Sequence, residues 1–220
     1  MKRYQTILFD LDGTLLNSLE DLKDSVNEIL KRHNYPVRSL EEIRTFVGNG
    51  AFHLIQCSLP KGCQEKEVQD CLKEYSDYYF THSQIKTCPY KGIPELLKEL
   101  QKKGFLVGVV SNKGEETVKD LCENYFPGCI SVAIGDKEGF QKKPAPDNVI
   151  RAIRELKGDE GTTLYVGDSE VDIKTAQNCH LDSVLVTWGF RTRKLLLEHG
   201  AKVLIDSPLE LLQYLDRGLL

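Results

Sequence analysis

Two aspartates near the start of the chain stand at a spacing that could carry chemistry. Residues 7–18 read ILFDLDGTLLNS, so an apolar run leads directly into Asp10 and Asp12, and Gly13 and Thr14 follow. Two carboxylates about 4 Å apart repel each other by roughly 4 kcal/mol at an effective dielectric constant near 20. The pair therefore requires either a cation between the carboxylates or a proton on one of them.

Three other apolar runs are followed by side chains that suit such a cation. The runs at 105–110, 130–134 and 162–167 lead, in order, to a hydroxyl with an amide, to two lysines before a proline, and to an acidic stretch. The residues are Ser111, Asn112, Lys142, Lys143, Asp168, Glu170 and Asp172. Carboxylates, a hydroxyl and a lysine at four strand ends indicate a site for a divalent metal and an anion.

The elements that position these residues follow from the hydrophobic pattern. From residue 92 onward, apolar runs of strand length alternate with helical patterns, and further runs lie at 183–187 and 202–205. Such alternation predicts an α/β fold with a Rossmann-like parallel sheet covered by helices on both faces. Ligands bind at the carboxyl ends of the strands in such sheets, so the four polar ends should converge.

The segment between the first strand and residue 92 has a different pattern. Leu19, Leu22, Val26 and Ile29 recur at helical spacing, and similar stripes continue toward Tyr75 without a strand-like run. We therefore predict a small α-helical cap domain over residues 16–82, inserted after strand one. The core domain would comprise residues 1–15 and 83–220.

Composition restricts the class of protein. The 220 residues are 40% hydrophobic and carry a formal net charge of −4, which is typical of a globular protein and argues against nucleic acid as a partner. No apolar run approaches the roughly 20 residues that span a membrane, and the N-terminal run is too short for a signal peptide. Seven cysteines without a Cys-x-x-Cys pair predict reduced thiols in the cytoplasm rather than a zinc site.

The residue types suggest a reaction. Carboxylate oxygens suit Mg²⁺, which would relieve the repulsion between the aspartates and attract a phosphate group. Asp10 could then attack phosphorus and form an aspartyl-phosphate. Asp12 is placed to protonate the leaving oxygen and later to deprotonate the attacking water. Ser111 and Lys143 would hold the phosphoryl oxygens on which charge accumulates.

As a set, these segments resemble the four motifs of the haloacid dehalogenase superfamily. DLDGT, Ser111, the Lys143-Pro144 pair and GDSEVD occur in the order of that family. The insert, with FVGNGA at 46–51, and VTWGFR at 186–191 are similar to segments of its phosphoglycolate-phosphatase-like branch, which has a small helical cap. The family often has a second acid where Asn17 stands, although asparagine is also tolerated there.

The resemblance implies roles for individual residues. Asp10 would be both nucleophile and metal ligand, and Asp12 would bind the metal through its backbone carbonyl. Asp168 would bind Mg²⁺, and Asp172 would either help to hold the hydrated metal or orient Lys143. The candidate phosphate-binding residues are Gly13, Thr14, Ser111, Asn112 and Lys143.

Several residues near this set have less definite roles. Gly48 and its neighbours form either a turn between cap helices or a place where the backbone approaches a ligand. We hypothesise that Arg44 pairs with a substrate carboxylate, in which case Arg44→Ala would raise KM for acidic substrates only. Lys113 is expected to be solvated, and Glu170 to be a surface residue or an outer-shell contact. Trp188 and Arg191 are expected to be loop residues near the site mouth.

The function that fits best is a Mg²⁺-dependent phosphatase acting on a small phosphomonoester, with 2-phosphoglycolate as the first candidate. Alternatives on the same scaffold are a sugar-phosphate phosphomutase, a pyrophosphatase and a catalytically silent binding protein. A phosphomutase would carry a histidine-lysine arrangement in the cap, and His33 and His53 have no such context. The expected partner is a small phosphorylated metabolite, with no nucleic acid or membrane, and the protein would be a monomer or a homodimer.

Overall fold

The central element of the protein is a six-stranded parallel sheet. The computed structural model describes residues 4–217. The strands lie in the order β5-β4-β1-β6-β7-β8, and every neighbouring pair is parallel, which confirms the predicted α/β class with a Rossmann-like sheet. Their bounds are β1 Thr6–Phe9, β4 Leu106–Gly114, β5 Val132–Asp136, β6 Thr163–Gly167, β7 Asp182–Val186 and β8 Leu204–Ile205.

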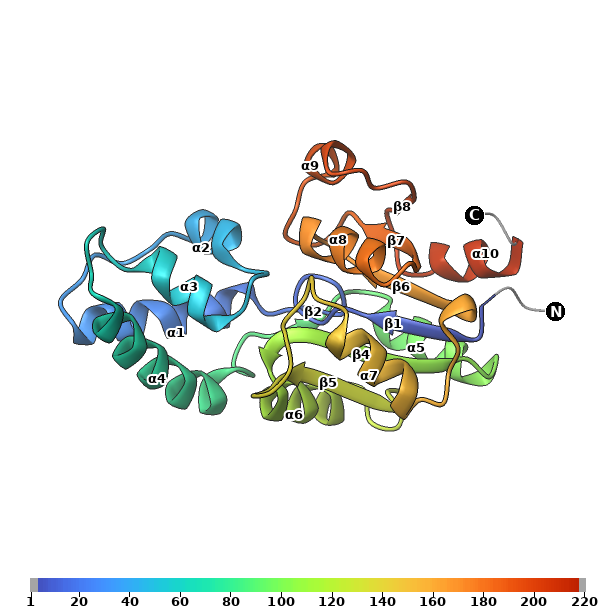
Figure 1. Cartoon of the computed structure of the whole chain (residues 1–220), viewed down its shortest axis with the longest axis horizontal. Coiled ribbons are helices and arrows are strands. Elements are labelled where there is room, and N and C mark those ends of the chain that lie inside the picture. Colours follow the sequence, from blue (N-terminus) through green and yellow to red (C-terminus); the bar gives the residue numbers. More distant parts are fainter. Residues whose placement is uncertain (1–3, 218–220) are drawn as a thin grey trace.

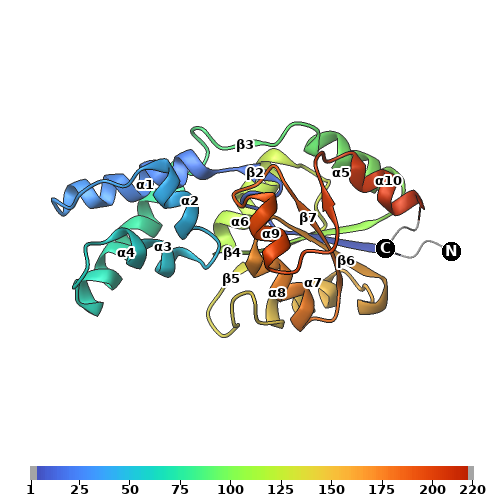
Figure 2. The ribbon, with the colours of Figure 1, turned by 90° about the horizontal axis from the view of Figure 1, so that it is seen from above.

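Helices cover both faces of this sheet because its strands alternate buried side chains between two cores. Ile7 and Phe9 of β1 pack into one cluster, whereas Leu8 packs into another on the opposite face. Figure 2 shows α5 and α10 on one side of the sheet and α7 and α8 on the other. The helices are α5 Ile93–Lys102, α6 Glu115–Tyr125, α7 Asp147–Glu155, α8 Glu170–Asn178, α9 Arg193–Glu198 and α10 Glu210–Arg217, with a 3₁₀ turn at Glu160–Thr162.

Four further helices form a separate layer beyond the carboxyl ends of the strands (Figure 1). They are α1 Leu19–Arg32, α2 Leu40–Phe46, α3 Ala51–Ser58 and α4 Glu65–His82. Their apolar side chains pack into a separate hydrophobic cluster, and Phe190 of the core packs into the same cluster. We call these helices the cap. The domain boundaries at 15/16 and 82/83 stay a prediction.

The two connections between cap and core are tied to each other. β2 (Leu16–Asn17) leads into the cap and pairs antiparallel with β3 (Cys88–Pro89), which leads out of it. Asp21 on α1 is buried, and its carboxylate accepts hydrogen bonds from the backbone N–H groups of Ile85, Lys86 and Thr87 at 3.1, 2.9 and 2.8 Å. Backbone donors thus satisfy a buried carboxylate and fasten the return connection to the cap.

The structure departs from the predicted elements in three places. β4 continues past Val110 to Gly114, with a register irregularity between these residues, so Ser111 lies within the strand rather than after it. The paired two-residue strands β2 and β3 were not predicted, because such short strands leave no alternating pattern, and β2 lies inside the insert that was expected to be wholly helical. Helix α9 was not predicted. Among residues 4–217, no helix combines the length and the apolar character that crossing a membrane requires.

Candidate active site

The site lies at the carboxyl end of β1, the strand between β4 and β6. β1 pairs with both neighbours, so Asp10, which follows it, stands between Ser111 of β4 and Asp168 at the end of β6. The backbone N–H of Asp10 donates to the Val166 carbonyl at 2.8 Å and continues the ladder. The convergence expected for polar residues at parallel strand ends is therefore present for these three residues.

Lys143 connects two of the site carboxylates. Its buried ammonium group donates to Asp10 Oδ1 at 2.8 Å, to Asp172 Oδ1 at 2.9 Å and to the Tyr165 hydroxyl at 3.0 Å. Burial alone would lower the pKa of Lys143, but Asp10 and Asp172 raise it well above its ordinary value, so the lysine is charged. It lies behind Asp10 and is not among the residues that line the cavity described below.

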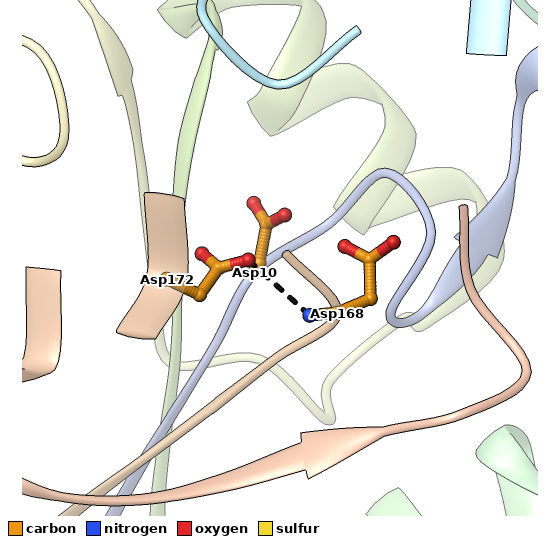
Figure 3. Close-up of side chains that lie close together, drawn as sticks. All are labelled: Asp10, Asp168 and Asp172. Carbon is orange, nitrogen blue, oxygen red and sulfur yellow. Dashed lines mark hydrogen bonds between the residues drawn. The ribbon is translucent and has the colours of Figure 1, made fainter. Parts of the chain in front are cut away.

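Three aspartates crowd into one small volume (Figure 3). Asp10, Asp168 and Asp172 each offer an oxygen within 4.8 Å of the others. Burial raises the pKa of Asp10 to about 7, against the lowering effect of Lys143 and with a further rise from Asp172. Burial, Asp172 and Asp10 likewise hold the pKa of Asp168 well above its ordinary value. This donor set of hard oxygens with excess negative charge fits a divalent cation such as Mg²⁺.

The carboxylate of Asp168 is enclosed by glycines. A Cβ atom on Gly13, whose φ is +87°, would lie 2.3 Å from Asp168 Oδ2, and one on Gly189 would lie 2.4 Å from the same oxygen. The backbone N–H of Phe190 donates to this oxygen at 2.6 Å. Only residues without a side chain leave room for Asp168 at this position, so the glycine of the DLDGT motif shapes a carboxylate site.

Asp172 uses both of its oxygens within the protein. Besides its contacts with Lys143 and Tyr165, it accepts hydrogen bonds at Oδ2 from the N–H groups of Asp168 and Ser169, at 3.2 and 3.1 Å, and from the Ser169 hydroxyl at 2.7 Å. It thereby caps the start of α8 and fixes the turn that carries Asp168.

Asp12 lies beside a lysine that we expected to be solvated. Lys113 Nζ is 3.2 Å from Asp12 Oδ1, and its side chain is only 7% exposed, so that expectation is wrong. Lys113 also donates to the hydroxyl of Tyr79, on cap helix α4, at 2.5 Å. The Ser18 hydroxyl donates to the same Asp12 oxygen. The cap thus supplies the contact that covers this lysine.

Asn112 and Ser111 lie next to the acidic cluster and line the cavity. The amide of Asn112 donates to the carbonyls of Gly48 and Lys143 at 3.0 and 2.9 Å and accepts from the Lys143 N–H at 2.8 Å. Asn112 therefore joins the loop of Lys143 to the turn of the cap that contains Gly48, whose φ is +119°. Ser111 Oγ accepts from the Lys113 N–H at 3.2 Å.

Thr14 and Arg44 lie outside the cavity lining. Thr14 is fully buried, and its carbonyl accepts from the indole N–H of Trp188 at 3.0 Å, which gives that tryptophan a contact behind the site. Its hydroxyl has no hydrogen-bond partner within the described part of the chain. Arg44 Nε lies 3.5 Å from Glu41 on the same helix. A role for Arg44 in substrate binding stays a prediction.

A cavity of about 130 Å³ separates the cluster from the cap. Its core wall is polar, and its cap wall is largely apolar and aromatic. The lining includes Asp10, Asp12, Ser111, Asn112, Lys113, Asp168 and Arg191 from the core, and Leu22, Val47, Gly48, Ala51, Leu54, Tyr75 and Tyr79 from the cap. An apolar cavity of about 150 Å³ holds a benzene molecule, so a space of this size suits a small organic phosphate.

Arg191 lies at the site, as expected from the sequence, and its contacts give it a role that the sequence did not define. It pairs with Glu170 at 2.8 Å and donates to the backbone carbonyls of Arg44 and Val47, in the cap, at 2.8 and 2.7 Å. Burial opposes ionisation of Glu170, but this pair lowers the pKa of its carboxyl. Arg191 follows the apolar run at 183–187, so the strand-end rule places it near the site but does not reveal its partners in the cap.

Comparisons with known proteins agree with this geometry. A family model described as haloacid dehalogenase-like hydrolase matches residues 7–186. The chain is 33% identical over 201 residues to a phosphoglycolate phosphatase of Rhodobacter capsulatus, covering 89% of this chain and 90% of that protein. It is 29% identical over 219 residues to the N-acetylmuramic acid 6-phosphate phosphatase of Pseudomonas aeruginosa, covering 99% of this chain and 97% of that protein.

A solved structure is also similar over the whole chain. The protein comes from Lactobacillus delbrueckii subsp. bulgaricus and is named provisionally as a phosphoglycolate phosphatase; the TM-score is 0.91 at 34% identity, covering 97% of this chain and 98% of that one. The present chain therefore belongs to the haloacid dehalogenase-like hydrolases. This confirms the resemblance that the motifs indicate, and with it the expected enzyme class, a phosphoric-monoester hydrolase.

Proposed function

We propose that this protein is a Mg²⁺-dependent phosphatase that hydrolyses a small phosphomonoester through an aspartyl-phosphate on Asp10. The observation that carries the proposal is the meeting of Asp10, Asp168 and Asp172 in one buried cluster that Lys143 only partly neutralises. The phosphatase names of the relatives support the reaction class. 2-Phosphoglycolate, named for several of them, is the first candidate substrate.

We assign the metal to Asp10 and Asp168 of the acidic cluster and, as the family resemblance implies, to the backbone carbonyl of Asp12. When bound, Mg²⁺ would neutralise the carboxylates and withdraw charge from the phosphoryl oxygens. Both oxygens of Asp172 are engaged in hydrogen bonds, and we therefore assign it to orienting Lys143 and the Asp168 turn. Of the two roles that the sequence left open for Asp172, we thus propose the orientation of Lys143 rather than a contact with the hydrated metal.

The residues of the chain then divide the reaction between them. The ionised carboxylate of Asp10 attacks phosphorus, and Asp12 donates a proton to the departing alkoxide. Water next attacks the phosphorus of the aspartyl-phosphate, Asp12 takes up its proton, and phosphate and the Asp10 carboxylate are regenerated. Lys143, bonded to Asp10, places positive charge beside the phosphoryl group, and Ser111 borders the cavity where its oxygens would lie.

The cap histidines give no support to the phosphomutase alternative. His33 Nε2 lies 3.0 Å from Glu74, and a ring nitrogen of His53 lies 3.5 Å from Cys57 Sγ. Among the described residues, the cavity lining includes no histidine. A cytoplasmic location and a monomeric or homodimeric state stay predictions, although all seven cysteines are free, as reduced thiols would be.

Turnover of p-nitrophenyl phosphate tests the proposal. We expect hydrolysis that requires Mg²⁺, stops with EDTA and falls at least about a thousandfold in Asp10→Asn, because the amide is not a nucleophile for phosphorus. Asp24→Asn, at an exposed carboxylate of α1, is the matched control and should retain activity. An acid quench during turnover should trap phosphate on the wild-type chain only. Wild-type activity in a folded Asp10→Asn variant would contradict the mechanism.

A further inference from the structure

The cap wall of the cavity carries no charged side chain among the residues that the structure describes. The side chains that the cap contributes are aliphatic, phenolic or, in one case, a serine at the edge: Leu22, Val47, Ala51, Leu54, Tyr75, Ser76 and Tyr79. Phe190 of the core closes the same wall. The part of a substrate that projects away from Asp10 therefore meets neutral and largely apolar surface.

The two cations of the cavity lining are already paired. All three donor nitrogens of Arg191 are engaged, by Glu170 and by the cap carbonyls of Arg44 and Val47. Lys113 lies between Asp12 and the hydroxyl of Tyr79, with a 7% exposed side chain. A substrate carboxylate that displaced Glu170 or Asp12 from its cation would leave that carboxyl group without its partner in a largely buried site.

The overall charge of the site also disfavours a carboxylate on the substrate. With Asp12 protonated as the general acid, Lys113, Lys143 and a bound divalent cation would exceed the charge of the other three aspartates by one, and a phosphate dianion would then make the loaded site negative. A second anionic group a few ångströms away is repelled by that net negative charge. An uncharged group suffers no such repulsion, and its apolar atoms gain contact with Leu54, Tyr75 and Phe190.

We propose that the leaving group of the substrate is an uncharged alcohol with an apolar side, and that 2-phosphoglycolate is a poor substrate. This inference rests on the proposed phosphatase function and narrows its substrate class. It ranks phosphate esters of neutral alcohols above 2-phosphoglycolate as candidate substrates, since the negative glycolate carboxylate would lie against the neutral cap wall. The space between the walls admits a group of several carbon atoms.

Matched pairs of esters test the inference on the intact protein with Mg²⁺. Glycolamide phosphate differs from 2-phosphoglycolate only by an amide in place of the carboxylate, and phenyl phosphate is compared with 4-carboxyphenyl phosphate in the same way. We expect kcat/KM to be at least about tenfold higher for the neutral member of each pair. If glycolamide phosphate and 2-phosphoglycolate are both hydrolysed too slowly to measure, the comparison of the two aryl phosphates tests the inference.

A charge added to the cap wall provides the second test. Ser76 lines the cavity but is otherwise exposed on α4, so a longer side chain fits there without being buried. Ser76→Lys should move the preference at least about fivefold toward the carboxylate member, whereas the neutral control Ser76→Gln should not move it. A wild-type preference for 2-phosphoglycolate over glycolamide phosphate would overturn the inference alone. Absence of Mg²⁺-dependent turnover of every ester would overturn the proposed function as well.

Discussion

Two adjacent lysines show how much the environment decides the role of a residue. Lys143 is 4% exposed and bonds to Asp10 and Asp172, whereas the side chain of Lys142 is 38% exposed and pairs with Asp136 at 2.8 Å. The same charge is thus placed once inside an acidic cluster and once at the surface, where an ion pair contributes little. These neighbours form a natural matched pair for mutagenesis.

Lys143→Met should lower kcat for p-nitrophenyl phosphate by at least about a hundredfold, because it removes the positive charge beside Asp10 and leaves two buried carboxylates unpaired. Lys142→Met should stay within about threefold of the wild type. Initial rates at saturating Mg²⁺ check the prediction, and circular dichroism shows whether each variant is folded. A folded Lys143→Met variant with full activity would refute the role given to this lysine.

At this scale, residue type and position predicted the acidic cluster, because Asp10 and Asp168 follow apolar runs whose strands are neighbours in the sheet. The contacts of Lys113 and Arg191 were not predictable in the same way. Each depends on a partner in the cap, Tyr79 in one case and the carbonyl of Val47 in the other. The packing of two layers, which one sequence does not reveal, decides such contacts.

Between elements, an ion-pair network joins α6 to α7. Glu115 begins α6, and its carboxylate pairs with Arg151 of α7 at 2.5 Å and with Lys119 at 2.8 Å. The hydrogen bond from Arg151, against the opposing effect of burial and with help from Lys119, lowers the pKa of Glu115 from 4.5 to about 2. The carboxylate is therefore ionised in the folded protein well below the pH at which it would be protonated in the unfolded chain.

A lowered folded-state pKa gives stability that is present above the unfolded value and lost as pH falls toward the folded value. Glu115→Gln should therefore lower the free energy of unfolding by about 1–2 kcal/mol at pH 7, after allowance for partial solvent screening. The deficit should shrink between about pH 4.5 and pH 2. Urea unfolding across this range provides the measurement, with Glu123→Gln, on the exposed side of α6, as control. A deficit that stays constant with pH would contradict the network.

Most elements were predictable because their patterns are long and regular. The five strands of the large sheet after the cap, β4 to β8, overlap with apolar runs, and α5 buries Ile93, Leu96, Leu97 and Leu100 on one face. The exceptions are short or irregular. α9 has six residues, β2 has two, and the extension of β4 passes through a register irregularity that its polar residues conceal.

On the scale of the whole molecule, side chains of the core hydrogen-bond to backbone and side-chain groups of the cap. Arg191 and Asn112 donate to the carbonyls of Val47 and Gly48, in the turn between α2 and α3. Lys113 of the core donates to the side-chain hydroxyl of Tyr79 on cap helix α4. These contacts hold the cap against the cavity, whereas the paired strands β2 and β3 form the covalent connection. Release of these contacts would let the cap open about that connection.

Arg191→Lys should loosen this closure, because one ammonium group cannot reproduce the planar fork that contacts Glu170 and two carbonyls together. We expect about tenfold faster amide hydrogen exchange in residues 45–51 and a raised KM with a smaller change in kcat. Arg193→Lys is the control, since Arg193 is half exposed and pairs with Asp206 on the core. Unchanged exchange in the Arg191 variant would show that the cap is held by other contacts.

The place of β1 in the sheet also has a consequence for how the chain is made. This strand leaves the ribosome before the other strands of the sheet, yet its two neighbours are β4 and β6, the second of which ends at Gly167. The cap helices are contiguous in sequence and can assemble while the nascent core still lacks its middle. The strand that leads to Asp10 thus waits longest for its partners, and its apolar residues stay exposed to wrong pairings during that interval.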